Sequence, residues 1–259
     1  QRCDYSRRTG KWRLRLSDSS GASMNCIEDL SVIIPVGPEE NAWKTILADL
    51  SVLPAEAEII IAAATECPGD FQSVLRTKGF TRGVKWLKSP KGRAQQMNAG
   101  AKAAHRSTLW FVHADSRISQ LAIASLKRSL EKKQSAIHFF NLVFLDDGPA
   151  LTRINTAGVW IRSHVLGLPF GDQGFCVSKA IFQKLGGFDE LAPYGEDHLF
   201  IWKARQKGVP LVCTGGWLGT SARKYSKDGW SATTVRNAVL TAKQAIPGFL
   251  RLLKERVIP

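Results

Sequence analysis

The stretch TLWFVHADSRI (108–118) combines a structural signal with a chemical one. Its first residues are apolar or aromatic, which is typical of a buried β-strand, and they lead directly to His113, Ala114 and Asp115. A carboxylate placed directly after a buried strand either caps the next helix or binds a ligand. The segments on either side of this stretch distinguish between these two roles.

Segments of the same apolar character lie on both sides of this stretch: LSVIIPV (30–36), EIIIAAA (58–64), VKWLKS (84–89) and AIHFFNLVFL (136–145). Segments of helical length alternate with them, at about 39–53, 69–79, 93–106 and 119–133. This alternation predicts an α/β fold with a mostly parallel central sheet and helices on both faces. Ligands bind such sheets beyond the carboxyl ends of the strands, where we expect Asp115.

The composition predicts one main domain. With 259 residues, of which 44% are hydrophobic, the chain is long enough for one good core. No apolar run reaches the roughly eighteen residues of a membrane-spanning helix, so we expect a soluble protein. The five cysteines form no CxxC pair and their number is odd, which argues against a disulfide framework or a zinc site and indicates a reducing cytoplasm.

The formal net charge of +14 is concentrated at the ends of the chain. Residues 1–23 contain six basic and two acidic residues, and residues 221–259 contain eight basic and two acidic residues. A nucleic-acid-binding face would need basic and aromatic residues interleaved on one surface, so we expect no nucleic-acid partner. The basic C-terminus either is a solvated surface or contacts phosphates or acidic lipids.

The segment SPKGRAQQMNAGAKAA (89–104) is predicted to form a turn that opens a small-residue helix, which places Arg93 and Asn98 near the same edge of the sheet as Asp115. Backbone N–H groups at a helix start and a guanidinium suit a diphosphate. A nearby carboxylate suits Mg²⁺ or Mn²⁺ bridging that diphosphate.

Five segments together resemble glycosyltransferase family 2, in the order and approximate spacing seen in that family. They are SVIIPVGPEENAWKTIL (31–47), KGRAQQMNAGAKAA (91–104), LWFVHADSRI (109–118), LPFGDQGFCVSKAIFQKLGGFDE (168–190) and GEDHLFIWKARQKG (195–208). The chain most resembles the branch of radical-SAM/selenodomain-associated transferases, over residues 30–235. The resemblance implies a GT-A (Rossmann-like) fold and a hexosyltransferase-type enzyme. It also implies an inverting, metal-dependent transfer of a sugar from a nucleotide-diphosphate donor to a hydroxyl acceptor.

The resemblance also implies roles for individual residues. Asp115, the last residue of the family's DXD element, becomes the ligand of Mg²⁺ or Mn²⁺, and His113 either supports it or is a buried, hydrogen-bonded imidazole. Asp197 becomes the catalytic base, with Glu196 as its neighbour and substitute; acidic residues are also favoured at a helix N-terminus on structural grounds alone. The predicted substrate-binding residues are Pro35, Glu39, Arg93, Asn98, Asp172, Gln173 and Arg223.

One departure from the family concerns the base of the nucleotide. Many members have an Asp-rich stretch after the second strand, whereas this chain has IIIAAATECPGD (59–70). The side chains of Ala62 to Ala64 cannot bond the base, which leaves Thr65 or Glu66 to replace the contact. Two alternatives therefore stay open: a non-catalytic family member, and a nucleotidyltransferase-like protein that binds a nucleotide sugar.

The domain organisation follows from these segments. Residues 1–23 have no clear period and are predicted to be a disordered leader. Residues 24–235 form the GT-A domain, with a nucleotide-sugar half at about 30–116 and an acceptor half at about 117–235. Residues 236–259 form an amphipathic helical tail, with a break expected at Pro247-Gly248 and a second short helix after it. This tail either packs on the domain or lies on an anionic membrane, which would place a cytoplasmic protein peripherally at the inner face of the membrane, near a lipid-linked acceptor.

Overall fold

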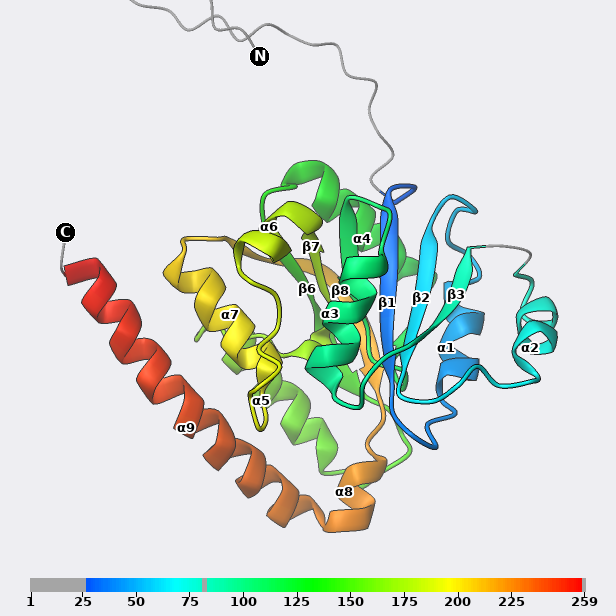
Figure 1. The fold of residues 1–259 in the computed structure, drawn as a ribbon. Helices are drawn as coiled ribbons and strands as arrows, with labels where there is room; N and C mark the ends of the chain where they lie inside the picture. Colours follow the sequence, from blue (N-terminus) through cyan, green and yellow to red (C-terminus); the bar gives the residue numbers. More distant parts are fainter. Residues whose placement is uncertain (1–26, 81–82, 258–259) are drawn as a thin grey trace, which may run out of the picture.

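The computed structural model describes residues 27–80 and 83–257, with side chains as far as Leu252 (Figure 1). The predicted leader, residues 1–23, lies outside the described residues. The strands are β1 (Leu30–Val36), β2 (Glu58–Ala63), β3 (Val84–Lys88), β4 (Thr108–Phe111), β5 (Arg117–Ile118), β6 (Ile137–Phe144), β7 (Phe175–Ser178) and β8 (Leu211–Thr220). The helices are α1 (Trp43–Leu50), α2 (Phe71–Thr77), α3 (Arg93–Ala103), α4 (Gln120–Lys132), α5 (Thr152–His164), α6 (Lys179–Lys184), α7 (Glu196–Gln206), α8 (Arg223–Asp228) and α9 (Trp230–Val257), with a 3₁₀ turn, η1, at Gly171–Gln173.

The described strands form one sheet in the order β3-β2-β1-β4-β7-β6-β8-β5. Strands β3, β2, β1 and β4 pair in parallel, and so do β6 and β8. β7 runs antiparallel to both of its neighbours, β4 and β6, and β5 runs antiparallel to β8. The predicted α/β fold with a mostly parallel sheet is confirmed.

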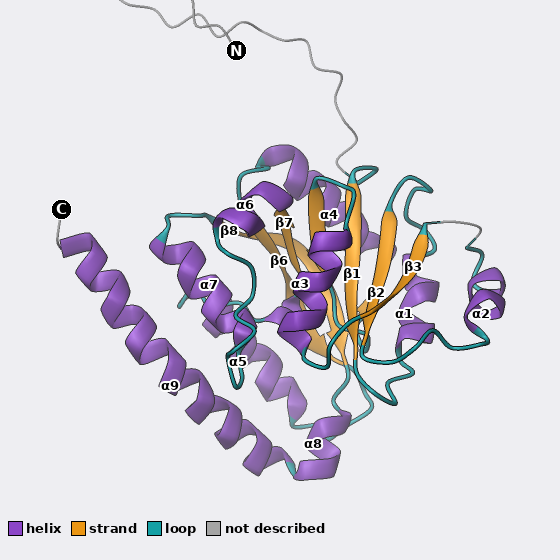
Figure 2. Cartoon of the chain, in the orientation of Figure 1, coloured by secondary structure: helices purple, strands orange, loops and turns teal. Residues whose placement is uncertain are grey.

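Helices cover both faces of this sheet (Figure 2). All seven residues of β1 are buried, because alternate side chains enter two different cores. Val32 and its even-numbered neighbours pack with α1, whereas Ile33 packs with α3 on the other face. A Cβ added at Gly100 of α3 would lie 2.5 Å from Ile33 Cγ2, so glycine is what lets α3 lie this close to the sheet.

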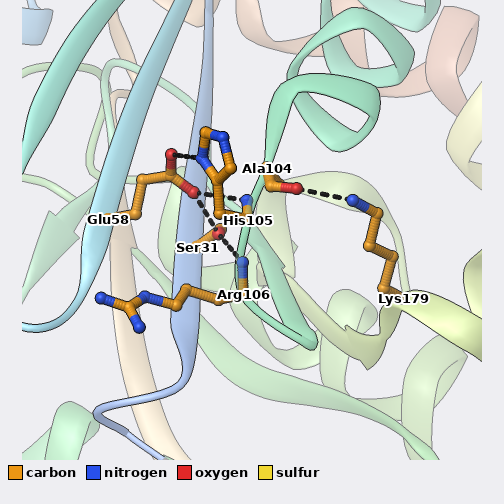
Figure 3. Close-up of polar contacts among 6 residues, drawn as sticks. All are labelled: Ser31, Glu58, Ala104, His105, Arg106 and Lys179. Atoms are coloured by element: carbon orange, nitrogen blue, oxygen red, sulfur yellow. Dashed lines mark hydrogen bonds and ion pairs between the residues drawn. The ribbon is translucent and has the colours of Figure 1, made fainter.

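A polar cluster at the amino end of β1 and β2 holds the connection from α3 to β4 (Figure 3). The Glu58 carboxylate accepts hydrogen bonds from Ser31 Oγ at 2.7 Å and from the backbone N–H of His105 at 2.9 Å. Lys179 Nζ donates to the carbonyl of Ala104 at 2.5 Å. These contacts fix the start of β4, so that its other end delivers Asp115 to the opposite edge of the sheet.

Helix α5 was not anticipated from the sequence. Only Thr152 and Ser163 of its residues are buried, and its large apolar residues face outward. A helix of this kind lacks the inward-facing apolar period by which amphipathic helices are recognised.

Helix α9 continues without a break from Trp230 to Val257, with Pro247 inside it, so the predicted break at Pro247-Gly248 was wrong. Gly248 lies directly against the indole of Trp202 in α7, and this packing holds the helix together across the missing N–H of the proline. Figure 1 shows α9, in orange to red, running along the outside of α7. Among the described residues, no helix combines the length and the apolarity needed to cross a bilayer.

Candidate active site

Asp115 follows β4 at the carboxyl edge of the parallel strands, as predicted. Its side chain is half-buried. Burial raises the pKa of this carboxyl, and the negative charges of Glu40 and Asp147 raise it further, while Arg223 acts in the opposite direction. Asp115 therefore lies in a cluster of acidic side chains. Two members of this cluster, Glu40 and Asp147, were not predicted from the sequence.

Asp197 lies in the first turn of α7 and is almost fully buried. Its Oδ2 accepts a hydrogen bond from the Gly171 N–H at 2.6 Å, and its Oδ1 accepts one from the His198 N–H at 2.8 Å. Burial alone would raise the pKa of this carboxyl, but Arg93, the two N–H groups and His113 together hold it below its usual value. Asp197 is thus an ionised carboxylate in a buried setting.

Arg93 begins α3 and connects two parts of the chain that are far apart in sequence. Its Nε donates to the carboxylate of Glu196. Burial lowers the pKa of the guanidinium, but the charges of Asp197, Glu196 and Asp172 outweigh burial and raise it. Nε is one of five N–H donors, so Arg93 can hold the acidic pair and still offer hydrogen bonds to a ligand.

His113 and Asp197 both lie against Gly171. A Cβ at position 171 would be 2.9 Å from Asp197 Oδ2 and 3.3 Å from His113 Nε2, so the close approach of the chain requires glycine there. Burial, together with the positive charge of Arg93, lowers the pKa of His113 to about 4 against the opposing effect of Asp197. The imidazole beside Asp197 is therefore neutral at pH 7.

Asp172 and Arg162 lie near these residues and influence each other electrostatically. Burial raises the pKa of Asp172, and Arg162 opposes this, while Asp197 and Asp115 add to it. Asp172 Oδ1 is buried without a hydrogen-bond partner among the described residues. Arg162, whose guanidinium lies 3.3 Å above the Phe170 ring, was missed from the sequence because it belongs to α5.

Two of the predicted substrate-binding residues, Gln173 and Asn98, are hydrogen-bonded within the fold, and their substrate-binding role stays a prediction. Gln173 is fully buried, its Nε2 donates to Phe140 O at 2.9 Å, and its Oε1 accepts from Phe170 N at 3.1 Å. Asn98 exchanges hydrogen bonds with the backbone of Phe188, accepting at 3.0 Å and donating at 2.9 Å. Both amides hold loops in place, and their principal donors and acceptors are already used.

The remaining predicted residues lie around the same edge. Pro35 is buried in β1. Glu39 is exposed and has a backbone φ of 64°, the left-handed region that is uncommon for a residue with a side chain. Arg223 is exposed at the start of α8, with its Nε 2.9 Å from Ser221 Oγ and 3.7 Å from Asp147.

The end of β2 and the residue after it, Ala62 to Ala64, offer the nucleotide base no polar side-chain group. The carbonyl of Ala62 accepts a hydrogen bond from Gln96 at 3.1 Å, and the carbonyl of Thr65 accepts one from Trp86 at 3.1 Å. Glu66 pairs with Lys88 on the neighbouring strand. A base contact here would therefore use the Thr65 hydroxyl or displace Lys88 from Glu66.

Helix α9 contributes a hydrogen-bonded chain that supports the start of α7. Trp202 Nε1 donates to His198 Nε2 at 3.0 Å, so the proton of this imidazole is on Nδ1, which donates to Gln244 Oε1 at 2.9 Å. Gln244 Nε2 in turn donates to the carbonyl of Tyr194 at 2.8 Å. The residues on either side of Glu196 and Asp197 are thus fixed by α9, which no local sequence pattern reveals.

The donor set around Asp115 fits a divalent cation that is only partly held by protein. No three His, Cys, Asp or Glu side chains within residues 27–80 and 83–252 converge into a closed metal cage. Mg²⁺ characteristically keeps several waters and binds one or two carboxylates plus the phosphates of a substrate. Asp115, with Glu40 and Asp147 nearby, provides that kind of site.

No family model matches the sequence and no curated protein matches it, whereas solved structures do. The mannosyltransferase PcManGT from Pyrobaculum calidifontis, in complex with GDP-Man and Mn²⁺, matches with a TM-score of 0.62 at 14% identity, over 88% of this chain and 68% of that chain. TarS 1–349 from S. aureus in complex with UDP-GlcNAc matches with a TM-score of 0.55 at 17% identity, over 74% of this chain and 58% of that chain. GalNAc-T7 with UDP, GalNAc and Mn²⁺ matches with a TM-score of 0.53 at 16% identity, over 74% and 43% of the two chains.

These likenesses define the class of fold. The protein has the GT-A fold found in glycosyltransferases, as predicted. The chain spans 36% of the longer TarS chain and about three fifths of its 1–349 fragment. The resemblance to the radical-SAM-associated branch of family 2 stays a prediction.

Proposed function

We propose that the protein is an inverting, metal-dependent glycosyltransferase of family 2 that moves a sugar from a nucleotide-diphosphate donor to a hydroxyl acceptor. One observation carries this proposal: two carboxylates from opposite halves of the chain, Asp115 and Asp197, lie at one edge of the sheet. Both affect the pKa of Asp172, which lies near each of them. The division into a nucleotide-sugar half (30–116) and an acceptor half (117–235) is part of the same proposal.

Asp197 is the group that would accept the proton of the acceptor hydroxyl. As that oxygen forms its bond to the anomeric carbon, the bond from this carbon to the departing diphosphate breaks on the opposite face of the sugar. A base must be ionised before it can accept a proton, and the lowered pKa of Asp197 meets this condition at pH 7. The N–H groups of Gly171 and His198 fix its orientation and leave other lone pairs free.

Glu196 has a different role from Asp197. Its carboxylate is held by Arg93 and is turned toward the start of α3. We assign it to orienting the guanidinium, which then meets the diphosphate of the donor together with Arg223. Glu196 therefore supports the site, and Asp197 is the base.

Asp115 would hold Mg²⁺ or Mn²⁺. When bound, the cation would neutralise the negative charge that develops on the departing diphosphate. The position of Asp115 after β4 places its carboxylate at the edge of the sheet, and Glu40 and Asp147 add negative charge around it. The Mn²⁺ in PcManGT and GalNAc-T7 belongs to proteins of the same fold and supports a divalent ion here.

The acceptor belongs to the proposal only as a class. We infer a hydroxyl-bearing, lipid-linked acceptor and a peripheral contact of the basic C-terminal region with a membrane, at its cytoplasmic face. Exposed apolar residues of α9, such as Phe249 and Ile246, support this contact. A nucleotide-sugar binder without transfer activity is the second candidate, favoured by Ala62 to Ala64 at the end of β2.

Donor binding tests the first part of the proposal. We expect one class of UDP-, GDP- or dTDP-sugar at about 100 times its Kd to raise the melting temperature by roughly 5–10 °C in the presence of Mn²⁺ or Mg²⁺, and EDTA to abolish the rise. Asp115→Asn should lose the metal-dependent rise. Asp146→Asn is the matched control, because that carboxylate is 96% exposed and its ion pair with Arg153 spans 4.0 Å.

Two results would count against the proposal. One is the absence of any rise with every donor in folded protein, and the other is a rise that persists in EDTA and in Asp115→Asn. A rise without measurable transfer or hydrolysis of the donor would support the second candidate, a non-catalytic binder.

A further inference from the structure

Helix α9 has two faces of opposite character. One face packs on the domain through buried Thr233, Gly248 and Leu252 and through the Gln244 hydrogen bonds to α7. The other face is apolar but exposed to solvent. Its large members are Val235, Val239, Ile246, Phe249 and Leu250, which are 61%, 47%, 62%, 51% and 54% exposed. An apolar stripe on the far side of a packed helix serves no purpose inside this fold.

Helix α5 repeats this pattern. Ile154 and Ile161 of α5 and the residues that flank it, Leu151 and Val165, recur at the spacing of one helix face and are 49% to 68% exposed. The two helices touch: Asn155 Nδ2 donates to Thr234 Oγ1 at 3.1 Å, and Trp230 Nε1 donates to Asn155 Oδ1 at 2.6 Å. We call these four apolar residues, together with Val235, Val239, Ile246, Phe249 and Leu250 of α9, the α5–α9 surface.

The charges next to this surface have one sign. Across α5, α8 and the part of α9 whose side chains are described (230–252), the only acidic side chain is Asp228, which pairs with Arg236 at 3.1 Å. The exposed basic residues of the same helices are Arg153, Arg223, Lys224, Lys227, Arg236, Lys243 and Arg251. Apolar side chains with a basic border match a surface that is apolar inside and negatively charged at its rim.

An anionic lipid bilayer has this chemistry. Amphipathic helices with Lys and Arg beside a Leu, Phe or Ile face lie in the headgroup region and bury their apolar face in the acyl boundary. A second copy of this chain fits less well. In a symmetric dimer the same patch meets itself, which would bring two strongly basic borders together.

We propose that the α5–α9 surface docks on a bilayer that contains anionic phospholipids. The inner face of α9 holds the start of α7 through Gln244, so the docked helix is also attached to the segment that contains Asp197. Docking therefore brings the candidate site to the bilayer surface, where a lipid-linked acceptor would present its hydroxyl. This inference rests on the membrane contact proposed above and not on the transfer chemistry.

The test is co-sedimentation of the full chain with vesicles of phosphatidylcholine alone and with about 30 mol% phosphatidylglycerol. We expect binding to the anionic vesicles that weakens as salt is raised. The triple variant Val239→Ser, Ile246→Ser, Phe249→Ser should bind at least about tenfold more weakly. Lys243→Gln should weaken binding about fivefold.

The matched controls are Leu121→Ser on α4 and Leu191→Ser, because these side chains are 80% and 93% exposed and lie outside the α5–α9 surface. Both should bind vesicles as the unchanged chain does. Melting temperatures establish that every variant is folded. Donor-induced thermal shifts, measured on the same samples without lipid, separate a failure of docking from a failure of the proposed function.

Three results would overturn the proposal. The first is equal binding to neutral and anionic vesicles, and the second is undiminished binding by the folded triple variant. The third is that the unchanged chain does not bind vesicles but forms a dimer in analytical ultracentrifugation, and that the triple variant is monomeric. That result would assign the surface to a second copy.

Discussion

At the scale of single residues, burial sets the chemistry of the site as much as residue type does. Asp172 and Asp197 are both buried, yet burial raises the pKa of Asp172 while Asp197 keeps a pKa below the usual value. The difference lies in their partners. The charge of Arg93 and two backbone hydrogen bonds lower the pKa of Asp197, whereas Asp172 Oδ1 accepts no hydrogen bond from the described residues. Two carboxylates of one type thus differ in their readiness to take a proton.

Sequence reasoning identifies residues whose role shows in a local pattern. Asp115 lies shortly after a strand and Asp197 lies at a helix start, so the places of both at the edge of the sheet could be predicted. Gln173 and Asn98 look the same from the sequence, but their partners, Phe140 and Phe188, come from other elements. The sequence around an Asn or Gln does not show whether its side-chain amide is hydrogen-bonded to the backbone of a distant residue.

His138 gives a prediction about pH and stability. It is fully buried, its Nδ1 accepts from Ser129 Oγ at 2.7 Å, and its Nε2 donates to Lys133 O at 2.9 Å. Burial lowers its pKa from 6.5 in the folded protein. Below pH 6.5 the unfolded chain therefore binds a proton that the folded chain does not, so this contribution is present above pH 6.5 and is lost as pH falls toward the folded pKa.

We expect the free energy of unfolding in urea to fall more steeply between pH 7 and pH 5 for the unchanged chain than for His138→Gln. The difference should reach about 1 kcal/mol per pH unit, since one bound proton corresponds to about 1.4 kcal/mol per unit. Parallel curves for the two proteins would show that His138 titrates alike in both states.

At the scale of elements, the strands β1, β2, β3, β4 and β6 were predicted, whereas β5, β8 and helix α5 were not, and α9 was predicted with a break that it does not have. Uninterrupted apolar runs mark β1 and β2 because both faces of these strands are covered. In α5 the large apolar residues face solvent, so no buried period exists to be found. In α9 the packing of Gly248 on Trp202 overrides the usual effect of a proline within a helix.

Two glycines in helices allow a matched test of this packing. A Cβ at Gly248 would overlap the Trp202 ring, whereas a Cβ at Gly158 of α5 would meet nothing within 4 Å. Gly248→Ala should therefore destabilise the protein by about 1–3 kcal/mol through overpacking. Gly158→Ala should stabilise it by about 0.5–1 kcal/mol through helix propensity.

Urea unfolding of the two alanine variants measures both effects. If Gly248→Ala also stabilised the protein, the contact between α9 and α7 would be looser than described, and the role of α9 in fixing the start of α7 would have to be abandoned.

At the scale of the whole molecule, alternating strands and helices predicted an α/β fold, and the family resemblance predicted the GT-A fold, which the comparisons confirm. The antiparallel β7 and the joining of the two halves could not be predicted in this way. Arg93 and Glu196 are 103 residues apart and meet only because the sheet brings the starts of α3 and α7 to one edge. The account of function depends on this meeting, since it makes one site out of Asp115 and Asp197.

Release of nucleoside diphosphate from the donor that binds tests this claim most directly. It is measured at saturating donor and Mn²⁺ for the unchanged chain, Asp115→Asn and Asp197→Asn, with water as the acceptor where no other is known. Asp197→Asn should bind the donor with an unchanged thermal shift but release diphosphate at least about 100-fold more slowly. Asp115→Asn should lose both binding and release. Release by folded Asp197→Asn at the rate of the unchanged chain would contradict the account, because Asp197 would then not be the base.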